Sequence, residues 1–470
     1  MSGRVSTAGA QARSRTTAMR ARFSKDSRAA LGRRAGRIRL FPAVTLALLA
    51  GLGVAAAAYG FLRWITPTDT SKPAAELDVT KVALTVVAGV GGVVALVIAY
   101  RRQRDLEQSR FVERFGTAAA QLGATDVAVR IAGVYAMAGV ADESDGLRRQ
   151  QCIDVLCGYL RLPYSPELGG NHQTKRVQKQ PRWPDGGDNE DHFEYRQNDR
   201  EVRATIVRVI ADHLRPTAEY SWSTSNFDFR TAHLEDVDLT EATFSGDVLF
   251  GGATFSGDAW FGGTSFARAA QFEKTTFFGV AWFEGATFSE DAMFDGASFA
   301  GGGRFTLARF FSNAWFNSAS FTAAARFEQA KFGDAALFNE VKFSGSTGFG
   351  GVTFIGEAWF VGTMFTEDTV FEGAAFSKQS RFDGASFFGD VGFDQATFIG
   401  AAQFEGVAFS GAALFARVDF GSEPISFAGP KQWGPPTPWF DWDQGISQKP
   451  ANVEPQDWPP TAATPPSSAA

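Results

Sequence analysis

Few residues in this chain combine the types and the spacing that chemistry at a protein site requires. Cys152 and Cys157 lie five positions apart in a stretch that is predicted to be helical. Two cysteines are too few for a disulfide framework or a four-cysteine zinc site, and their scarcity is typical of a reducing compartment. The four histidines are scattered, so no pairing of nucleophile and base is indicated. We therefore predict that the chain is not an enzyme.

A second group of side chains has the chemistry of metal ligands. Its members lie in one polar segment and are His172, Asp185, Asp188, Glu190, Asp191 and His192. Their spacing follows no diagnostic metal-binding pattern, and a solvated loop accounts for them better. The sequence thus predicts no metal and no other cofactor.

The most unusual feature of the sequence is its phenylalanine spacing. The chain has 46 Phe and 50 Gly but only 7 Tyr and 5 Met. Between Phe244 and Phe420, phenylalanine recurs in alternating steps of six and five residues without a slip. A fixed period of this kind indicates a solenoid built from repeated structural units.

The residues around each phenylalanine suggest how one unit folds. A small or β-branched residue usually stands two positions before the ring, and a glycine often stands two positions after it. Alternate side chains of an extended segment share a face, so the small residue and the ring both point inward, and the glycine supplies a corner. We predict a core of stacked rings that begins with Phe244, Phe250, Phe255, Phe261, Phe266 and Phe272.

These motifs resemble those of the pentapeptide-repeat proteins, in their Phe-centred variant. Residues 286–290 read Ala-Thr-Phe-Ser-Glu, and residues 297–301 read Ala-Ser-Phe-Ala-Gly. The resemblance covers residues 227–427 and implies an all-β, right-handed quadrilateral β-helix with four motifs per coil. One added residue in every second motif predicts 22 residues per coil, about eight coils, and a bulge at the corners. Examples of the added residue are Asp247, Asp258, Asp291 and Asp368.

Counting outward positions at intervals of 22 residues predicts the composition of each side. One side collects an apolar column, and another carries two tryptophans followed by Arg304 and Arg326. Contiguous apolar surface commonly marks a contact with a protein or a membrane. Two interpretations stay open: these side chains form a contact surface, or they cover the backbone of neighbouring coils. The candidate interaction surface comprises Met293, Trp315, Leu337, Trp359, Trp260 and Trp282.

The N-terminal region has the pattern of a membrane anchor. Residues 41–62 and 82–100 contain no charge, and arginines flank both runs on their outer sides. These lengths suit membrane helices, and the positive-inside rule places both ends of the hairpin in the cytoplasm. The resemblance is thus to a bacterial, membrane-anchored type of pentapeptide-repeat protein in the cell membrane. The preceding arm, 1–39, holds eleven basic residues and one acid. It is predicted to be disordered; contact with anionic lipid or nucleic acid is the alternative.

Between the anchor and the repeats, apolar periodicity predicts a small α-helical domain. Asp126 is expected to cap its second helix. The predicted organisation is a basic tail (1–39), a first membrane helix (40–65), a short loop (66–81), a second membrane helix (82–100), a helical juxtamembrane domain (101–215) with a mobile loop (163–197), the β-helix (227–427), and a Pro- and Trp-rich cap with a disordered tail (428–470).

These features favour a membrane-anchored, non-catalytic scaffold that binds a protein partner or another copy of itself. The alternative is a DNA mimic that regulates a nucleic-acid enzyme such as a type II topoisomerase, because residues 227–427 carry a net charge of −14. Basic residues interrupt any acidic stripe, however, and a membrane tether suits this role poorly. We expect no nucleic-acid partner.

Overall fold

A computed structural model gives the architecture of most of the chain. The chain divides into two compact units, Met1–Phe111 and Val112–Ala470. No helix within the described residues is both long and apolar enough to cross a membrane. Much of the predicted first span, 40–65, lies outside those residues, whereas the predicted second span, 82–100, lies within a longer described helix, Ala74–Leu122, to which this finding applies. The structure describes residues 53, 56–57, 60–61, 64–65, 74–164, 166, 175–182, 187–194 and 199–462.

The helices with defined bounds that precede the repeats are α3 (Ala74–Leu122), α4 (Val127–Asp142), α5 (Gly146–Leu160) and α6 (Asp199–Leu214). The C-terminal part of one long helix, α3, and three further helices lie in the region predicted to be a helical juxtamembrane domain, 101–215. Asp126 caps the second helix as expected, because its side chain accepts hydrogen bonds from the amides of Ala128 (2.7 Å) and Val129 (3.3 Å).

The segment predicted as a loop, 163–197, contains regular structure. β1 (Lys175–Arg182) and β2 (Gly187–Glu194) form a two-stranded antiparallel sheet. The sequence did not predict these strands, because their residues are mostly polar and do not alternate with apolar residues to form an apolar face.

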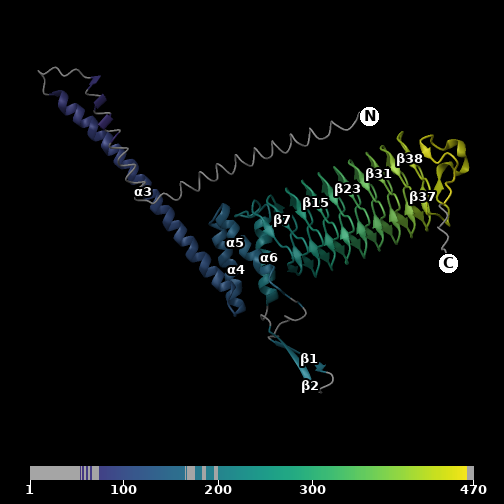
Figure 1. Ribbon diagram of the computed structural model, residues 1–470, viewed down its shortest axis with the longest axis horizontal. Coiled ribbons are helices and arrows are strands. Elements are labelled where there is room, and N and C mark those ends of the chain that lie inside the picture. The colour runs from purple at the N-terminus through teal and green to yellow at the C-terminus, as the bar shows by residue number, and fades with distance from the viewer. Residues whose placement is uncertain are drawn as a thin grey trace, which may run out of the picture. The chain divides into compact units, whose positions relative to one another are not determined.

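The rest of the chain is a parallel β-solenoid of about ten coils with four sides (Figure 1). We number the sides in chain order. Side one consists of β3 (Phe227–Asp228), β7 (Val248–Leu249), β11 (Ala270–Gln271), β15 (Ala292–Met293), β19 (Ala314–Trp315), β23 (Ala336–Leu337), β27 (Ala358–Trp359), β31 (Ser380–Arg381), β35 (Ala402–Gln403), β38 (Ile425–Ser426) and β41 (Val453–Glu454). Side two consists of β4 (His233–Leu234), β8 (Thr254–Phe255), β12 (Thr276–Phe277), β16 (Ser298–Phe299), β20 (Ser320–Phe321), β24 (Lys342–Phe343), β28 (Met364–Phe365), β32 (Ser386–Phe387), β36 (Ala408–Phe409) and β39 (Gln432–Trp433).

The other two sides are built in the same way. Side three consists of β5 (Val237–Asp238), β9 (Ala259–Trp260), β13 (Ala281–Trp282), β17 (Gly303–Arg304), β21 (Ala325–Arg326), β25 (Thr347–Gly348), β29 (Thr369–Val370), β33 (Val391–Gly392), β37 (Ala413–Phe415) and β40 (Trp439–Phe440). Side four consists of β6 (Thr243–Phe244), β10 (Ser265–Phe266), β14 (Thr287–Phe288), β18 (Arg309–Phe310), β22 (Lys331–Phe332), β26 (Thr353–Phe354), β30 (Ala375–Phe376) and β34 (Thr397–Phe398).

The strand register confirms the predicted circumference. Phe266 pairs with Phe244 below it and with Phe288 above it, 22 residues away in each direction. Rings of one column stack in parallel, as Phe261 and Phe283 do with centroids 4.7 Å apart and planes 1° apart. Rings of neighbouring columns meet edge to face. The six rings predicted to begin the core, Phe244, Phe250, Phe255, Phe261, Phe266 and Phe272, are each at most 1% exposed.

The added residue at alternate corners has a role in joining the coils. Asp258 accepts a hydrogen bond from the amide of Val280, one coil further on, at 2.8 Å. Asp368 accepts one from Asp390, and Asp390 accepts one from Ala412 in the same way. An acceptor at this position satisfies a backbone amide that the ladder leaves free at the corner.

Both ends of the solenoid are covered. At the N-terminal end, α6 lies against the first coil, where its apolar residues meet Phe229 and Leu234. At the other end, aromatic rings pack on the last coil, with Phe440 and Trp458 meeting edge to face at 4.9 Å. The short helices η1 (Asp441–Gln444) and η2 (Ile446–Gln448) belong to this cap.

The solenoid is longer than the phenylalanine spacing predicts. Strand pairing continues past the predicted end at 427, because β41 (Val453–Glu454) pairs with β38, within the tail that the sequence predicts to be disordered. Steps in this region lengthen: Ala402 pairs with Ile425, and Ile425 pairs with Val453. A fixed period does not predict these coils, because loops of varying length separate their strands.

Candidate interaction surface

The apolar column predicted from the sequence lies in consecutive coils of side one. Met293 pairs with Trp315, Trp315 with Leu337, and Leu337 with Trp359. We call these four residues the aromatic face. All four side chains are half-buried, so the column is less exposed than its sequence suggests. One reason is coverage from the next coil, since the Arg381 guanidinium lies 5.6 Å from the centroid of the Trp359 ring.

Hydrogen-bonded polar side chains border the aromatic face on both edges. On one edge, Asn317 donates from Nδ2 to Asp295 Oδ1 at 2.9 Å, and Asn339 donates to Asn317 Oδ1 at 2.9 Å. On the other edge, Ser312 and Asn313 donate to Asp291 Oδ1 at 2.7 and 3.0 Å. These bonds join successive coils and hold the borders of the face in fixed positions.

The second predicted column lies on side three. Trp260 and Trp282 stack with ring centroids 4.6 Å apart, and Arg304 extends the stack one coil further. Trp260 is 39% exposed, whereas Trp282 is half-buried. The six residues of the candidate surface therefore divide between two sides of the solenoid and do not form one patch.

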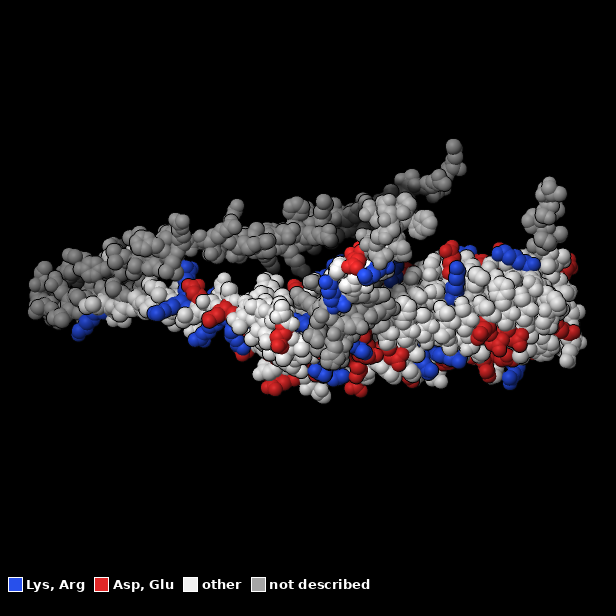
Figure 2. Space-filling model, turned by 90° about the horizontal axis from the view of Figure 1, so that it is seen from below, with Lys and Arg blue, Asp and Glu red and all other residues white. Residues whose placement is uncertain are grey.

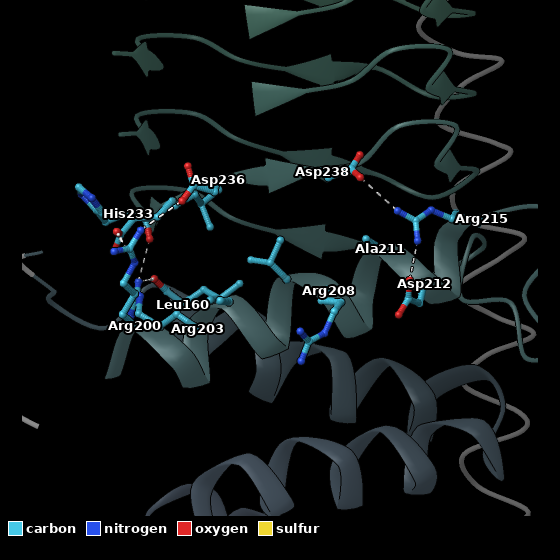
Figure 3. A pocket seen from close by; sticks show the side chains of 14 residues that line it. Leu160, Arg200, Arg203, Arg208, Ala211, Asp212, Arg215, His233, Asp236 and Asp238 are labelled. Carbon is cyan, nitrogen blue, oxygen red and sulfur yellow. Dashed lines mark hydrogen bonds and ion pairs between the residues drawn. The ribbon is translucent and has the colours of Figure 1, made fainter. Parts of the chain in front are cut away.

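A cleft of about 390 Å³ lies between α6 and the first coil, and the sequence does not predict it (Figure 3). An ion pair closes each end. Arg200 pairs with Glu235 at 3.0 Å at one end, and Arg215 pairs with Asp238 at 3.4 Å at the other. Arginines recur on α6 and acids on the facing strands, but only the fold reveals that they meet.

The polar groups in this cleft mainly tie the helical domain to the solenoid. The buried Arg203 donates to the carbonyl oxygens of Leu160 and His233, and its guanidinium lies 4.4 Å from the Tyr164 ring centroid. Burial lowers the pKa values of both Arg203 and His233. Arg130 and Asp199 form a buried ion pair at 2.6 Å, and Asp199 also lies 3.8 Å from Arg203. This network therefore joins the helical domain to the first coil of the solenoid.

The residues considered for chemistry lie apart from these surfaces. Cys152 and Cys157 are buried in α5, and burial raises their pKa values to about 11 and about 12, so both remain thiols at neutral pH. His192 lies beside Glu190 at 3.4 Å in the β1–β2 hairpin. His172 and Asp185 lie outside the described residues. Within the described part of the chain, no three His, Cys, Asp or Glu residues are placed to hold a metal ion.

Charges on the solenoid are mixed and do not form one stripe. Figure 2 shows acidic and basic side chains along the solenoid, separated by broad uncharged areas. The interrupting basic residues fall in adjacent coils, with Arg304 beside Arg326 on side three and Arg309 beside Lys331 on side four. This distribution differs from the continuous negative charge of a nucleic-acid backbone.

Comparison with known proteins identifies the repeats. The family described as pentapeptide repeats (9 copies) matches residues 229–273, 261–309 and 327–375. These segments lie within the four-sided solenoid. No curated protein and no solved structure matches the chain.

Proposed function

We propose that this pentapeptide-repeat solenoid is a non-catalytic scaffold that binds a protein partner along side one. The observation that carries the proposal is the aromatic face, in which four consecutive coils present Met293, Trp315, Leu337 and Trp359 in one ladder. Tryptophan side chains are enriched among the residues that contribute most of the binding energy in protein interfaces, and two of the four residues here are tryptophans.

The borders of the face support the same proposal. Protein interfaces commonly combine an apolar centre with a polar rim. Here the centre is the aromatic face, and the rim includes the Asp295, Asn317 and Asn339 ladder. Because the rim side chains already bond to one another, a partner would meet a surface that needs little reorganisation.

Site-specific photocrosslinking in intact cells tests the proposal. A photoreactive residue in place of Leu337 should yield a discrete crosslinked protein, and the yield should fall at least several-fold when Trp315 and Trp359 are replaced by serine. The same photoreactive residue in place of Ser320, on side two of the coil that carries Trp315, is the matched control.

The double variant should keep the wild-type circular dichroism, because both side chains point away from the phenylalanine core. A crosslink of equal yield from position 320, or one that survives both substitutions, would show that the aromatic face is not the binding surface.

We also propose that the scaffold is tethered to the cell membrane with both termini in the cytoplasm. The support is the pair of uncharged runs, 41–62 and 82–100, with arginine-rich outer flanks. The tether predicts that the full chain stays in the membrane pellet after alkaline carbonate extraction, and that removing residues 1–100 releases it. Release of the intact chain by carbonate would contradict the tether without affecting the proposed binding surface.

A further inference from the structure

One corner of the solenoid, between sides four and one, carries an alternation of large and small residues. The backbone amides stack coil upon coil, as when Gly333 donates to Phe310 O at 2.7 Å and Ile355 donates to Phe332 O at 2.8 Å. Phe311, Ile355 and Ile399 are 63, 50 and 58% exposed. We call this column the ridge; in coil order it consists of Ser289, Phe311, Gly333, Ile355, Ser377 and Ile399.

The next position along the chain forms a second column with segregated charge. Within the six coils of the ridge, its two acids stand in the earlier coils and its lysine in a later coil, and all three charged side chains are exposed. Arg268, one coil before Glu290, continues the same column, but it lies beyond the ridge and pairs with Asp247 at 2.7 Å. We call it the charged column; in coil order it consists of Glu290, Ser312, Asp334, Gly356, Lys378 and Gly400.

The ridge is complementary to itself in one orientation. Consider a two-fold axis that is perpendicular to the rod and passes between the coils of Gly333 and Ile355. It relates the chain to a second copy that runs antiparallel. Gly333 then faces Ile355 of the second copy, and Phe311 faces Ser377 of that copy. Each large side chain then meets a small one. A parallel pairing would instead oppose Phe311 to Phe311, and an antiparallel pairing shifted by one coil would oppose Ile355 to Ile355.

The same orientation matches the charges. The charged columns of the two copies lie opposite each other, because an antiparallel two-fold keeps like sides together. Lys378 of one copy then faces Ser312 of the other and is flanked by Glu290 and Asp334 of that copy. The symmetry repeats this arrangement, so both lysines lie between two acids. Complementary charge of this kind fixes register and orientation.

We propose that two copies of this chain associate side by side and antiparallel through the ridge and the charged column. The contact is isologous, with the same surface used by both copies. It goes beyond the proposed scaffold function and does not use the aromatic face. Six coils at roughly 4.8 Å give a contact about 29 Å long. A strip of one corner is smaller than the roughly 800 Å² per partner of a standard interface, so the dimer should dissociate on dilution.

Charge exchange tests this arrangement in the full-length protein. Lys378→Glu alone should reduce the dimer fraction at least several-fold in sedimentation velocity, and so should the pair Glu290→Lys with Asp334→Lys. An equimolar mixture of these two variants should form a heterodimer, because the side chain at position 378 of each chain again lies between two side chains of opposite charge. Restored association on mixing cannot come from misfolded chains.

The ridge itself is tested by Phe311→Ser with Ile355→Ser, which should also give monomers. The matched control is Phe278→Ser with Phe388→Ser, two exposed rings at the corner between sides two and three, which should leave the dimer intact. The proposal is overturned if the wild-type chain is monomeric at all concentrations, if Lys378→Glu leaves association unchanged, or if mixing fails to restore it. Association lost equally with both pairs of serine variants would indicate nonspecific apolar contact.

Discussion

Arg304 lies over the indole ring of Trp282, with its guanidinium carbon 4.4 Å from the ring centroid. The two residues are register partners in adjacent coils of side three. Because Trp260 stacks on the opposite face of the same indole, the three side chains form one continuous stack. Attraction between a guanidinium and an aromatic face contributes roughly 0.5–1 kcal/mol at exposed sites.

We expect Arg304→Ala to lower the free energy of unfolding by about 0.5–1 kcal/mol, because it removes this cation from the indole face. Urea titration followed by circular dichroism measures the loss. Arg309→Ala, in the same coil on side four, is the control and should have a smaller effect. Equal losses in both variants would show that the stacking adds nothing beyond general packing.

Gly279 should not tolerate a side chain. A Cβ atom there would lie 2.5 Å from the backbone of Gly257 in the preceding coil, whereas a Cβ at Gly262 would have no atom closer than 3.8 Å. Forcing adjacent coils apart resembles overpacking and should cost roughly 1–3 kcal/mol. Gly279→Ala is therefore expected to lower the melting temperature measurably more than Gly262→Ala, and the reverse order would contradict the close approach of the coils.

Asp258 should stabilise the solenoid as a hydrogen-bond acceptor and not through its charge. Asp258→Ala leaves the Val280 amide without its acceptor and should cost about 1 kcal/mol. Asp258→Asn keeps an oxygen in the same place and should retain most of the stability, as Asn226 does by accepting from the Asp247 amide at 2.8 Å. Chemical denaturation of the two variants separates these roles. An Asn variant as unstable as the Ala variant would point to charge instead.

The solenoid could be predicted from sequence because each coil repeats the same local rule. The step from Phe244 to Phe266 fixes the circumference, and the fixed circumference assigns Met293 and Trp315 to one side. The sequence could not give the cleft at α6, because Arg215 and Asp238 meet only after two different elements pack together. It also understated how far neighbouring side chains, such as Arg381 over Trp359, cover the aromatic face.

Two aspartates should influence stability in opposite directions as pH changes. A hydrogen bond from Arg230 lowers the pKa of Asp228, while burial raises the pKa of Asp394. A lowered pKa means that the ionised Asp228 stabilises the fold at pH values above the ordinary carboxyl pKa of about 3.9. This contribution disappears as the pH falls through the folded pKa. The ionised Asp394 destabilises the fold at neutral pH, and protonation relieves this cost.

Thermal unfolding at a series of pH values checks both signs. At pH 7, Asp394→Asn should raise the melting temperature and Asp228→Asn should lower it. Both differences should shrink as the medium is acidified, because the wild-type carboxylates then become neutral as well. A melting temperature of Asp394→Asn below that of the wild type at pH 7 would contradict the effect of burial.

The 22-residue period also determines how such a rod can change in evolution. Each coil bonds only to the coils directly below and above it, as Phe266 does with Phe244 and Phe288. Duplicating or deleting one whole turn would change the length by roughly 4.8 Å and keep every outward residue on its own side. A gain or loss of a single motif would move all downstream residues to the neighbouring side, so the regular part of the rod is expected to grow in whole turns. Added residues leave the sides unchanged where they loop out at a corner, as between Ile425 and Val453.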